Sequence, residues 1–293
     1  MLTLLLVAQA GTCTVSTTTI HSQAEATGLA SCRTVQGTVL IAPDAGPQID
    51  ISGPSRITGD LIVEDNGIIE SLRGNDLTIV GGRFFMRNVT RLSTLSLPSL
   101  TQVKTLTWRT LNALDTLNIG PPGLTKAEEV IISDTFLSSL DGVDLTSVKS
   151  MGIDNNRRLT EFTTQLGNLS DSLNIQANGL QLKVSMPNLK WIANMTIANV
   201  TSFEVPSLVV VNGSARFDSN YFTTFSAPNL TATRSGDISF VGNANLQNIS
   251  VPVLSTIGGG LLIANNTALS ELNGFPALKA VGGAIKLRGN FTK

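Results

Sequence analysis

Apolar residues recur along this 293-residue chain at a period of 20 to 24 residues. Each repeat contains one apolar anchor in a stretch where inward apolar positions alternate with outward ones, the pattern of a short β-strand with one buried face. A period this regular over nearly the whole chain predicts a solenoid, in which each repeat forms one coil and stacks on the next. The anchors are Ile41, Val63, Met86, Trp108, Ile132, Ile153, Ile175, Ile197, Phe217, Phe240, Ile263 and Leu287.

The positions after each anchor predict how a coil closes. An apolar pair three residues apart, such as Leu246 and Ile249, predicts a second wall, and the recurring Pro-x-Leu predicts the bend between the walls, because proline lacks a backbone donor. Asparagine recurs three residues past the anchor, which predicts a hydrogen-bonded ladder at one corner rather than a set of exposed turn residues. The ladder positions are Asn66, Asn156, Asn178, Asn220, Asn243, Asn266 and Asn290. We therefore expect an all-β solenoid of about 11–12 coils of ~22 residues, spanning residues 37–293.

The segment ahead of the repeats has a different pattern. Residues 1–10 have the short apolar run and Ala-x-Ala ending of a partial signal peptide, although a buried first strand is the alternative interpretation. Cys13 and Cys32 are the two cysteines of the chain, and in a secreted protein a disulfide between them is favoured over two free buried thiols. Between them, Ser22 and Glu25 form a capping-box pattern that predicts a short helix over residues 22–31. We interpret residues 11–36 as a disulfide-linked N-terminal cap.

Composition excludes several classes of partner. Apolar residues make up 42% and charged residues 14% of the chain, and the formal net charge is -1. This charge provides no electrostatic attraction for nucleic acid or an anionic membrane surface. Beyond residue 10, no apolar run approaches the ~20 residues of a membrane span.

Parallel β-helices also include polysaccharide-degrading enzymes, in which paired carboxylates at outward strand positions would be expected. Glu64, Asp154 and Asp218 point outward but lie on coils that stacking separates by roughly 15 to 20 Å. The single histidine, His21, lies in the cap and is best explained as a surface residue beside the helix. The sequence has no metal-ligand spacing and no phosphate-binding loop. Glycine clusters at residues 81–82, 258–260 and 282–283 belong to the coil entrances. We expect no catalytic, metal or cofactor site.

Several motifs together carry a family resemblance. The entry Cys32-Arg-Thr-Val-Gln-Gly-Thr-Val-Leu-Ile41, with Gly-x-Leu-x-Ile and Pro-x-Leu-x-x-Val in later coils, resembles the receptor L domain, a leucine-rich right-handed β-helix. The upstream Cys13 and the segments Ser-Leu-Pro-Ser-Leu100 and Glu-Val-Pro-Ser-Leu208 are closer to the fungal GPI-anchored cell-wall organisation proteins of the sporulation-specific and extracellular-mutant type. The resemblance covers residues 11–293. It implies a right-handed solenoid and a secreted, non-enzymatic glycoprotein of the cell wall or outer plasma-membrane face.

The resemblance indicates the expected partners, and the sequence itself indicates the candidate modification sites. Wall polysaccharide or wall glycoproteins are the expected partners, with membrane attachment only through a GPI anchor that this chain does not contain. The alternatives are a carbohydrate-active β-helix enzyme and a ligand-binding receptor ectodomain. The last repeat is expected to be truncated, which would expose Ile285 and Leu287. Candidate N-glycosylation sites are Asn88, Asn168, Asn194, Asn199, Asn212, Asn229, Asn248, Asn265 and Asn290.

Overall fold

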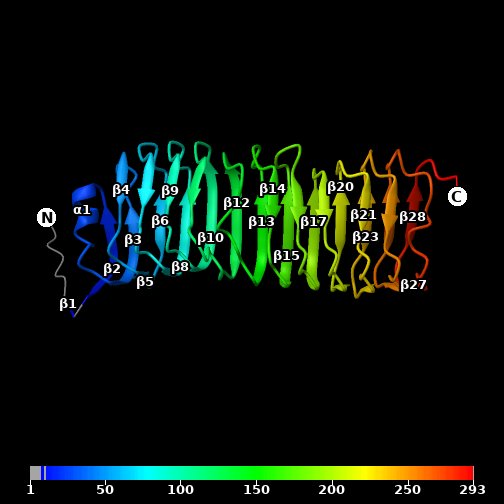
Figure 1. Cartoon of the computed structure of the whole chain (residues 1–293), viewed down its shortest axis with the longest axis horizontal. Coiled ribbons are helices and arrows are strands. Elements are labelled where there is room, and N and C mark those ends of the chain that lie inside the picture. The colour runs from blue at the N-terminus through cyan, green and yellow to red at the C-terminus, as the bar shows by residue number, and fades with distance from the viewer. Residues whose placement is uncertain (1–7, 10, 293) are drawn as a thin grey trace. The chain divides into compact units, whose positions relative to one another are not determined.

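The computed structural model describes residues 8–9 and 11–292. The chain divides into two units, residues 1–145 (unit 1) and residues 146–293 (unit 2). Each unit is a parallel β-solenoid, and the two together comprise about 13 turns of roughly 22 residues (Figure 1). The predicted fold class is confirmed. None of the helical segments in the described residues has the length and hydrophobicity of a membrane-spanning helix.

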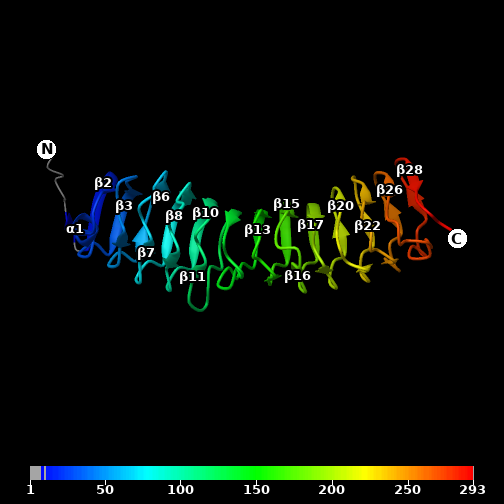
Figure 2. The ribbon, with the colours of Figure 1, turned by 90° about the horizontal axis from the view of Figure 1, so that it is seen from above.

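Unit 1 has two walls, which lie on opposite sides of the coil in Figure 2. The strands of its broad wall are β2 (Thr12–Ile20), β3 (Thr34–Ile41), β5 (Arg56–Ile57), β6 (Leu61–Glu64), β8 (Ile79–Arg87), β10 (Gln102–Leu111) and β12 (Glu129–Thr135). The narrow wall consists of β4 (Gln48–Asp50), β7 (Ser71–Arg73), β9 (Thr94–Ser96) and β11 (Thr116–Asn118). Neighbouring coils in each wall pair in parallel, so every coil covers the backbone edge of the one before it.

Unit 2 repeats the arrangement. Its broad wall contains β13 (Val148–Asp154), β15 (Asn168–Gln176), β17 (Trp191–Ala198), β19 (Val210–Val211), β20 (Ala215–Asp218), β22 (Ala232–Thr233), β23 (Ile238–Val241), β25 (Thr256–Ile257), β26 (Leu261–Ala264), β27 (Ala280–Val281) and β28 (Ile285–Arg288). The narrow wall has two short sheets, formed by β14 (Glu161–Thr163), β16 (Lys183–Ser185) and β18 (Ser202–Glu204), and by β21 (Thr224–Ser226) and β24 (Asn248–Ser250).

The predicted anchors form the core. Every anchor from Ile41 to Ile263 is 2% exposed or less, whereas Leu287 is 46% and its neighbour Ile285 is 57% exposed. Strand pairing places anchors of neighbouring coils side by side, for example Ile197 with Phe217. One strand step of about 4.8 Å brings like side chains into contact, so the periodic pattern builds a continuous core.

Aromatic residues fill the core of unit 2 from both walls. The Phe217 and Phe240 rings on the broad wall stack with centroids 4.7 Å apart. Phe225, on β21 of the narrow wall, lies 4.4 Å from Phe217 and 5.2 Å from Phe240, also measured between centroids. This cluster joins the two walls, because rings are wide enough to span a core about one side chain thick.

The N-terminal segment differs in part from the prediction. The Cys13–Cys32 disulfide is present, and Ser22 caps α1 (Gln23–Thr27), which is shorter than the expected helix over residues 22–31. Residues 12–20 form a full strand of the broad wall, in which Ile20 pairs with Ile41. This additional strand contributes to the turn count of about 13 rather than 11–12. The expected signal segment lies outside the described residues, except for β1 (Ala8–Gln9), which pairs antiparallel with β2.

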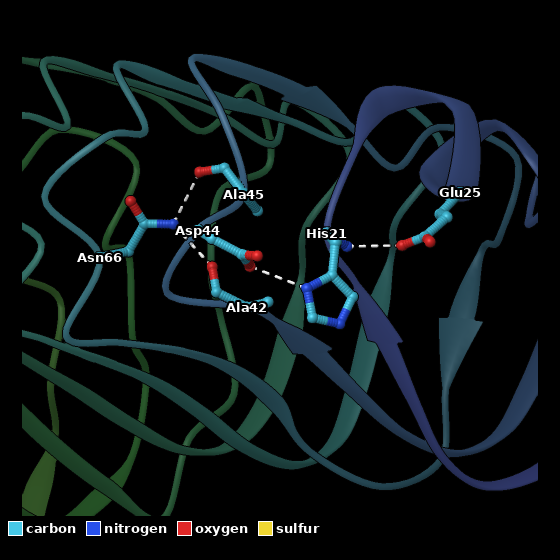
Figure 3. Close-up of polar contacts among 6 residues, drawn as sticks. All are labelled: His21, Glu25, Ala42, Asp44, Ala45 and Asn66. Carbon is cyan, nitrogen blue, oxygen red and sulfur yellow. Dashed lines mark hydrogen bonds and ion pairs between the residues drawn. The ribbon is translucent and has the colours of Figure 1, made fainter. Parts of the chain in front are cut away.

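Polar contacts fix the cap helix to the first coils (Figure 3). Glu25 accepts a 2.6 Å hydrogen bond from the His21 N–H, so the returning bond of the capping box goes to the residue before Ser22. His21 Nδ1 lies 2.8 Å from the Asp44 carboxylate, and both side chains are exposed. This hydrogen bond lowers the pKa of Asp44. The contact is solvated, as expected for a surface histidine.

The asparagine ladder is confirmed in unit 2, and unit 1 contains a buried asparagine at the equivalent position. Asn66 Nδ2 donates to the carbonyls of Ala42 and Ala45, both at 2.8 Å (Figure 3). In unit 2 the ladder is direct, since Asn220 Nδ2 donates to Asn243 Oδ1 and Asn243 Nδ2 donates to Asn266 Oδ1, each at 3.0 Å. The ladder residues from Asn66 to Asn266 are 6% exposed or less, whereas Asn290 is exposed.

The residue before each ladder asparagine from Asn66 to Asn266 has a left-handed backbone conformation, which the repeat pattern does not indicate. Asp65, Asn155, Ser219 and Asn265 have φ between 52° and 59°. This conformation turns the chain sharply out of the strand. At the coil entrances, glycine is required by close packing instead: a Cβ on Gly258 would lie 2.1 Å from the carbonyl oxygen of Arg234.

Candidate interaction surface

The outward residues of each broad wall form three rows that run across the strands. The central row contains the residue before each inward anchor. The entry row lies two residues earlier and the corner row two residues later along each strand. Strand pairing keeps these rows in register, for example Arg216 with Ser239 and Ser239 with Leu262. The predicted inward and outward phases are therefore confirmed.

In unit 1 the central row is mostly bulky and apolar. Its half-buried members are Leu40, Ile62, Phe85, Thr107 and Ile131. Ion pairs flank this row on both sides, Asp60 with Arg83 in the entry row and Glu64 with Arg87 in the corner row. The Arg83 guanidinium also lies 5.8 Å from the centroid of the Phe85 ring. The result is a surface with an apolar centre and charged margins.

In unit 2 the central row varies in size, and a hollow forms where it is small. Ser239 is only 8% exposed and lies between Arg216 and Leu262 in neighbouring coils. Glycines at residues 259, 260 and 283 remove side chains from the entry side. The hollow has a volume of about 600 Å³, and the side chains that supply its chemistry are Arg216, Asp218, Asp237, Ser239, Leu262 and Lys286.

A second hydrogen-bonded ladder follows the entry row. In unit 2 the Ser214 N–H donates to Asn194 Oδ1 at 3.0 Å, the Asp237 N–H to Ser214 Oγ at 3.1 Å, and the Gly260 N–H to Asp237 Oδ1 at 2.6 Å. Unit 1 contains the same device at Asp60, whose Oδ1 accepts from the Arg83 N–H at 2.7 Å. This ladder fixes the Asp237 carboxylate at the margin of the hollow.

The repeat pattern does not reveal the entry-row ladder. Its members differ in type, and each is an ordinary turn residue. The available signal was their phase: Thr38, Asp60, Ser214 and Asp237 each follow a coil-entrance glycine directly. The recurring glycine is visible in the repeat, whereas the short polar residue after it differs from coil to coil and is recognised only once the rows are known.

The hollow perturbs the titration of Asp218. This residue lies two residues after Arg216 on β20 and therefore shares its outward face. Burial raises the pKa of Asp218, while the positive charge of Arg216 acts in the opposite direction. The carboxylate is therefore less well solvated than an ordinary surface aspartate.

The carboxylates considered for catalysis are not brought together. Glu64 is paired with Arg87 in unit 1. In unit 2, Asp154 on β13 and Asp218 on β20 are separated by β15 and β17, a distance of about 14 Å at three strand steps. Among the described residues, no group of three or more His, Cys, Asp or Glu side chains is placed to hold a metal ion.

The glycosylation motifs are unequally divided between the units. Asn88 is the one candidate in unit 1, and the other eight of the nine lie in unit 2. Asn88, Asn199 and Asn265 lie two residues after an anchor, at the left-handed position where the chain turns out of the strand, with φ between 52° and 62°. The remaining sites in unit 2 are Asn168, Asn194, Asn212, Asn229, Asn248 and Asn290, and each is exposed or half-buried.

Several known fungal proteins are similar to this chain. It is 39% identical over 274 residues to a "Cell surface GPI-anchored protein" of Arthroderma benhamiae, a match that covers 93% of this chain and 70% of the relative. The chain belongs to the family of fungal GPI-anchored cell-surface proteins. "Protein ecm33" of Aspergillus fumigatus is 37% identical over 85% of this chain and 62% of its own length.

A third relative extends the range of the family. "Sporulation-specific protein 2" of Saccharomyces cerevisiae is 34% identical over 90% of this chain and 52% of its own length. The chain thus spans between about half and 70% of the length of these relatives. No family model matches the chain. No solved structure matches it either.

Proposed function

We propose that this protein contributes to fungal cell-wall organisation without catalysis, by presenting the outer faces of its broad walls to wall polysaccharide or wall glycoproteins. The observation that carries the proposal is the row arrangement of these faces in a member of a cell-surface protein family. Side chains repeat at strand spacing over many coils, which suits a partner that is itself extended and repetitive.

The distribution of polar groups supports a binding role. Glycosidases of the usual type hold two carboxyl groups within about 10 Å of each other across the scissile bond. Here the outward Asp154 and Asp218 lie farther apart than that spacing, and Glu64 and Asp60 are each engaged by an arginine. The two carboxylates of the hollow are also separated: Asp237 lies four residues before Val241, the residue that pairs with Asp218, which is about 13 Å along the strand. Groups held in this way orient a ligand through hydrogen bonds and leave its bonds intact.

The test is binding with simultaneous detection of turnover. The secreted, glycosylated chain is incubated with insoluble β-glucan, chitin and mannan, and with detergent-extracted wall glycoproteins, and bound protein is measured in the pellet. Soluble reducing ends are measured in the same tubes. We expect retention by at least one wall fraction with no release of reducing ends above the heat-denatured control. Product release, or no retention by any fraction, would contradict the proposal.

A further inference from the structure

The hollow on the outer face of unit 2 differs from the rest of the broad walls. Three groups give it a mixed lining: the cations Arg216 and Lys286, the carboxylates Asp218 and Asp237, and the hydroxyl of Ser239. Two positive and two negative side chains sum to a net charge of zero. A site with this balance has no preference for an anion or a cation, but it offers both donors and acceptors.

The hollow also has an apolar side chain in its lining, and it is elongated across the strands. Leu262 lies in the central row between Ser239 and Lys286, so one side of a ligand meets hydrocarbon while its edges meet polar groups. The hollow extends from β20 across β23 and β26 to β28, a length of about 14 Å at three strand steps. Sugar rings have apolar faces and hydroxyl-bearing edges, so a short stretch of saccharide matches this distribution.

We infer that this hollow is a binding site for an uncharged polysaccharide chain, which lies across β20, β23, β26 and β28. The inference rests on the proposed function and assigns one of its contacts to particular residues. Asp237 accepts from ligand hydroxyls through the oxygen that the Gly260 N–H leaves available. Arg216 and Lys286 donate from the two ends, and Ser239 forms the floor. Burial at Asp218 strengthens its hydrogen bonds to a ligand hydroxyl, since the carboxylate is already partly desolvated.

A polysaccharide of the wall and the protein's own N-glycan share this chemistry. Asn194 lies on β17, next to β20, and its side chain is exposed. The external polysaccharide is the proposed ligand of the hollow. Thr196→Ala removes the Asn194 glycosylation motif while retaining the Asn194 side chain that accepts from Ser214, so this variant separates the two sources.

The decisive variant fills the hollow without removing its charged groups. Ser239→Phe places a ring on the floor of the hollow. Thr107→Phe is the matched control, because Thr107 occupies the equivalent position in the central row of unit 1. Calorimetric titration of the full chain uses laminarihexaose, chitohexaose and mannohexaose as probes. We expect one hexasaccharide to bind, Ser239→Phe to weaken it by about tenfold or more, and Thr107→Phe to leave it unchanged.

Other outcomes separate this inference from the proposed function. Retention by insoluble polysaccharide that survives Ser239→Phe would overturn the site while leaving the proposed function intact. If no wall fraction retained the unmodified chain, both the polysaccharide site and the proposed function would be overturned. Hexasaccharide binding that appears only in Thr196→Ala would assign the hollow to the protein's own glycan and overturn the inference. Should Ser239→Phe fail to fold, Arg216→Ala with Arg109→Ala as its control tests the same prediction.

Discussion

At the scale of a single residue, the Asn243 side chain connects three neighbouring coils through hydrogen bonds. Its Oδ1 accepts from the backbone and side-chain N–H groups of Asn220 at 2.8 and 3.0 Å. Its Nδ2 donates to the Phe217 carbonyl at 2.8 Å and to Asn266 Oδ1 at 3.0 Å. Asn243 is 0% exposed, so these donors and acceptors have no access to water. The side chain therefore serves as the partner of backbone groups that the turn removes from the strand ladder.

Asn243→Ala should lower the free energy of unfolding of unit 2 by about 3 kcal/mol, because it leaves several buried donors and acceptors unpaired. Asn245→Ala is the control. This exposed neighbour donates one 3.3 Å hydrogen bond to the Tyr221 carbonyl, and its loss should cost about 0.5 kcal/mol or less. Urea unfolding measures both values, and equal effects would show that the ladder contributes nothing specific.

Asp218 gives a second residue-scale prediction, which concerns pH. Its pKa is raised in the folded state, so its contribution to stability is fully present below the unfolded pKa of about 4 and is lost as the pH rises through the folded pKa. Asp218→Asn removes this titration. We expect the variant to gain melting temperature relative to the unmodified chain at pH 7, and to lose that advantage near pH 3. A difference that does not change with pH would contradict the assignment.

At the scale of elements, the phase of the broad-wall strands was predictable and the cap was predictable in part. Alternation at Ile153, Ile175 and Ile197 identifies the buried face because the same parity recurs in every coil. The strand at residues 12–20 was not predicted, because the segment is rich in threonine and its apolar residues are too few to show a clear alternation. Only the pairing of Ile20 with Ile41 reveals it.

The hollow could not be predicted, for a physical reason. Its residues occupy ordinary outward positions, and its shape comes from the small size of Ser239 and from glycines on neighbouring coils. These features become a concavity only when the register between coils is known. A single strand of the pattern contains no information about which residues of the next coil lie beside it.

Ile197→Asp tests the strand phase directly. Ile197 is 0% exposed between Ile175 and Phe217, so an unpaired carboxylate there should unfold the surrounding coils. The adjacent Thr196 is outward and half-buried, and Thr196→Asp should change stability by about 0.5 kcal/mol or less. Circular dichroism melting compares the two variants after enzymatic deglycosylation, because Thr196→Asp also removes the Asn194 motif. Similar losses would mean that the phase is wrong.

The cap provides a prediction at the same scale. The disulfide between Cys13 and Cys32 closes a loop with a sequence separation of 19 residues, which corresponds to about 3 kcal/mol of stabilisation in the chain-entropy account. Cys32→Ser should therefore increase hydrogen exchange in α1 and β2, with smaller effects in β8 and β10. Ser31→Ala, at the exposed neighbouring residue, is the control. Unchanged exchange in β2 would show that the disulfide is not needed to hold the first coil.

At the scale of the whole molecule, the two units share one architecture and differ in their surfaces. Unit 1 combines an apolar central row with ion pairs and one glycosylation motif, whereas unit 2 combines a polar hollow with eight motifs. The repeat pattern predicts the common architecture, because the inward positions obey one rule throughout. Outward positions are free to differ from coil to coil, and that freedom allows two parts of one solenoid to carry different surfaces.

This division predicts that N-glycans maintain the solubility of unit 2. Charged residues are 14% of the chain, the net charge is -1 and the isoelectric point is near 5.9, so electrostatic repulsion between molecules is weak. Replacing the Ser or Thr of all eight unit 2 motifs by Ala should cause aggregation near pH 6, while removal of the Asn88 motif by Thr90→Ala should not. Light scattering measures aggregation, and thermal melting checks that both variants remain folded. A folded eight-site variant that stays monodisperse at pH 6 would show that the side chains of unit 2 are sufficient for solubility without its glycans.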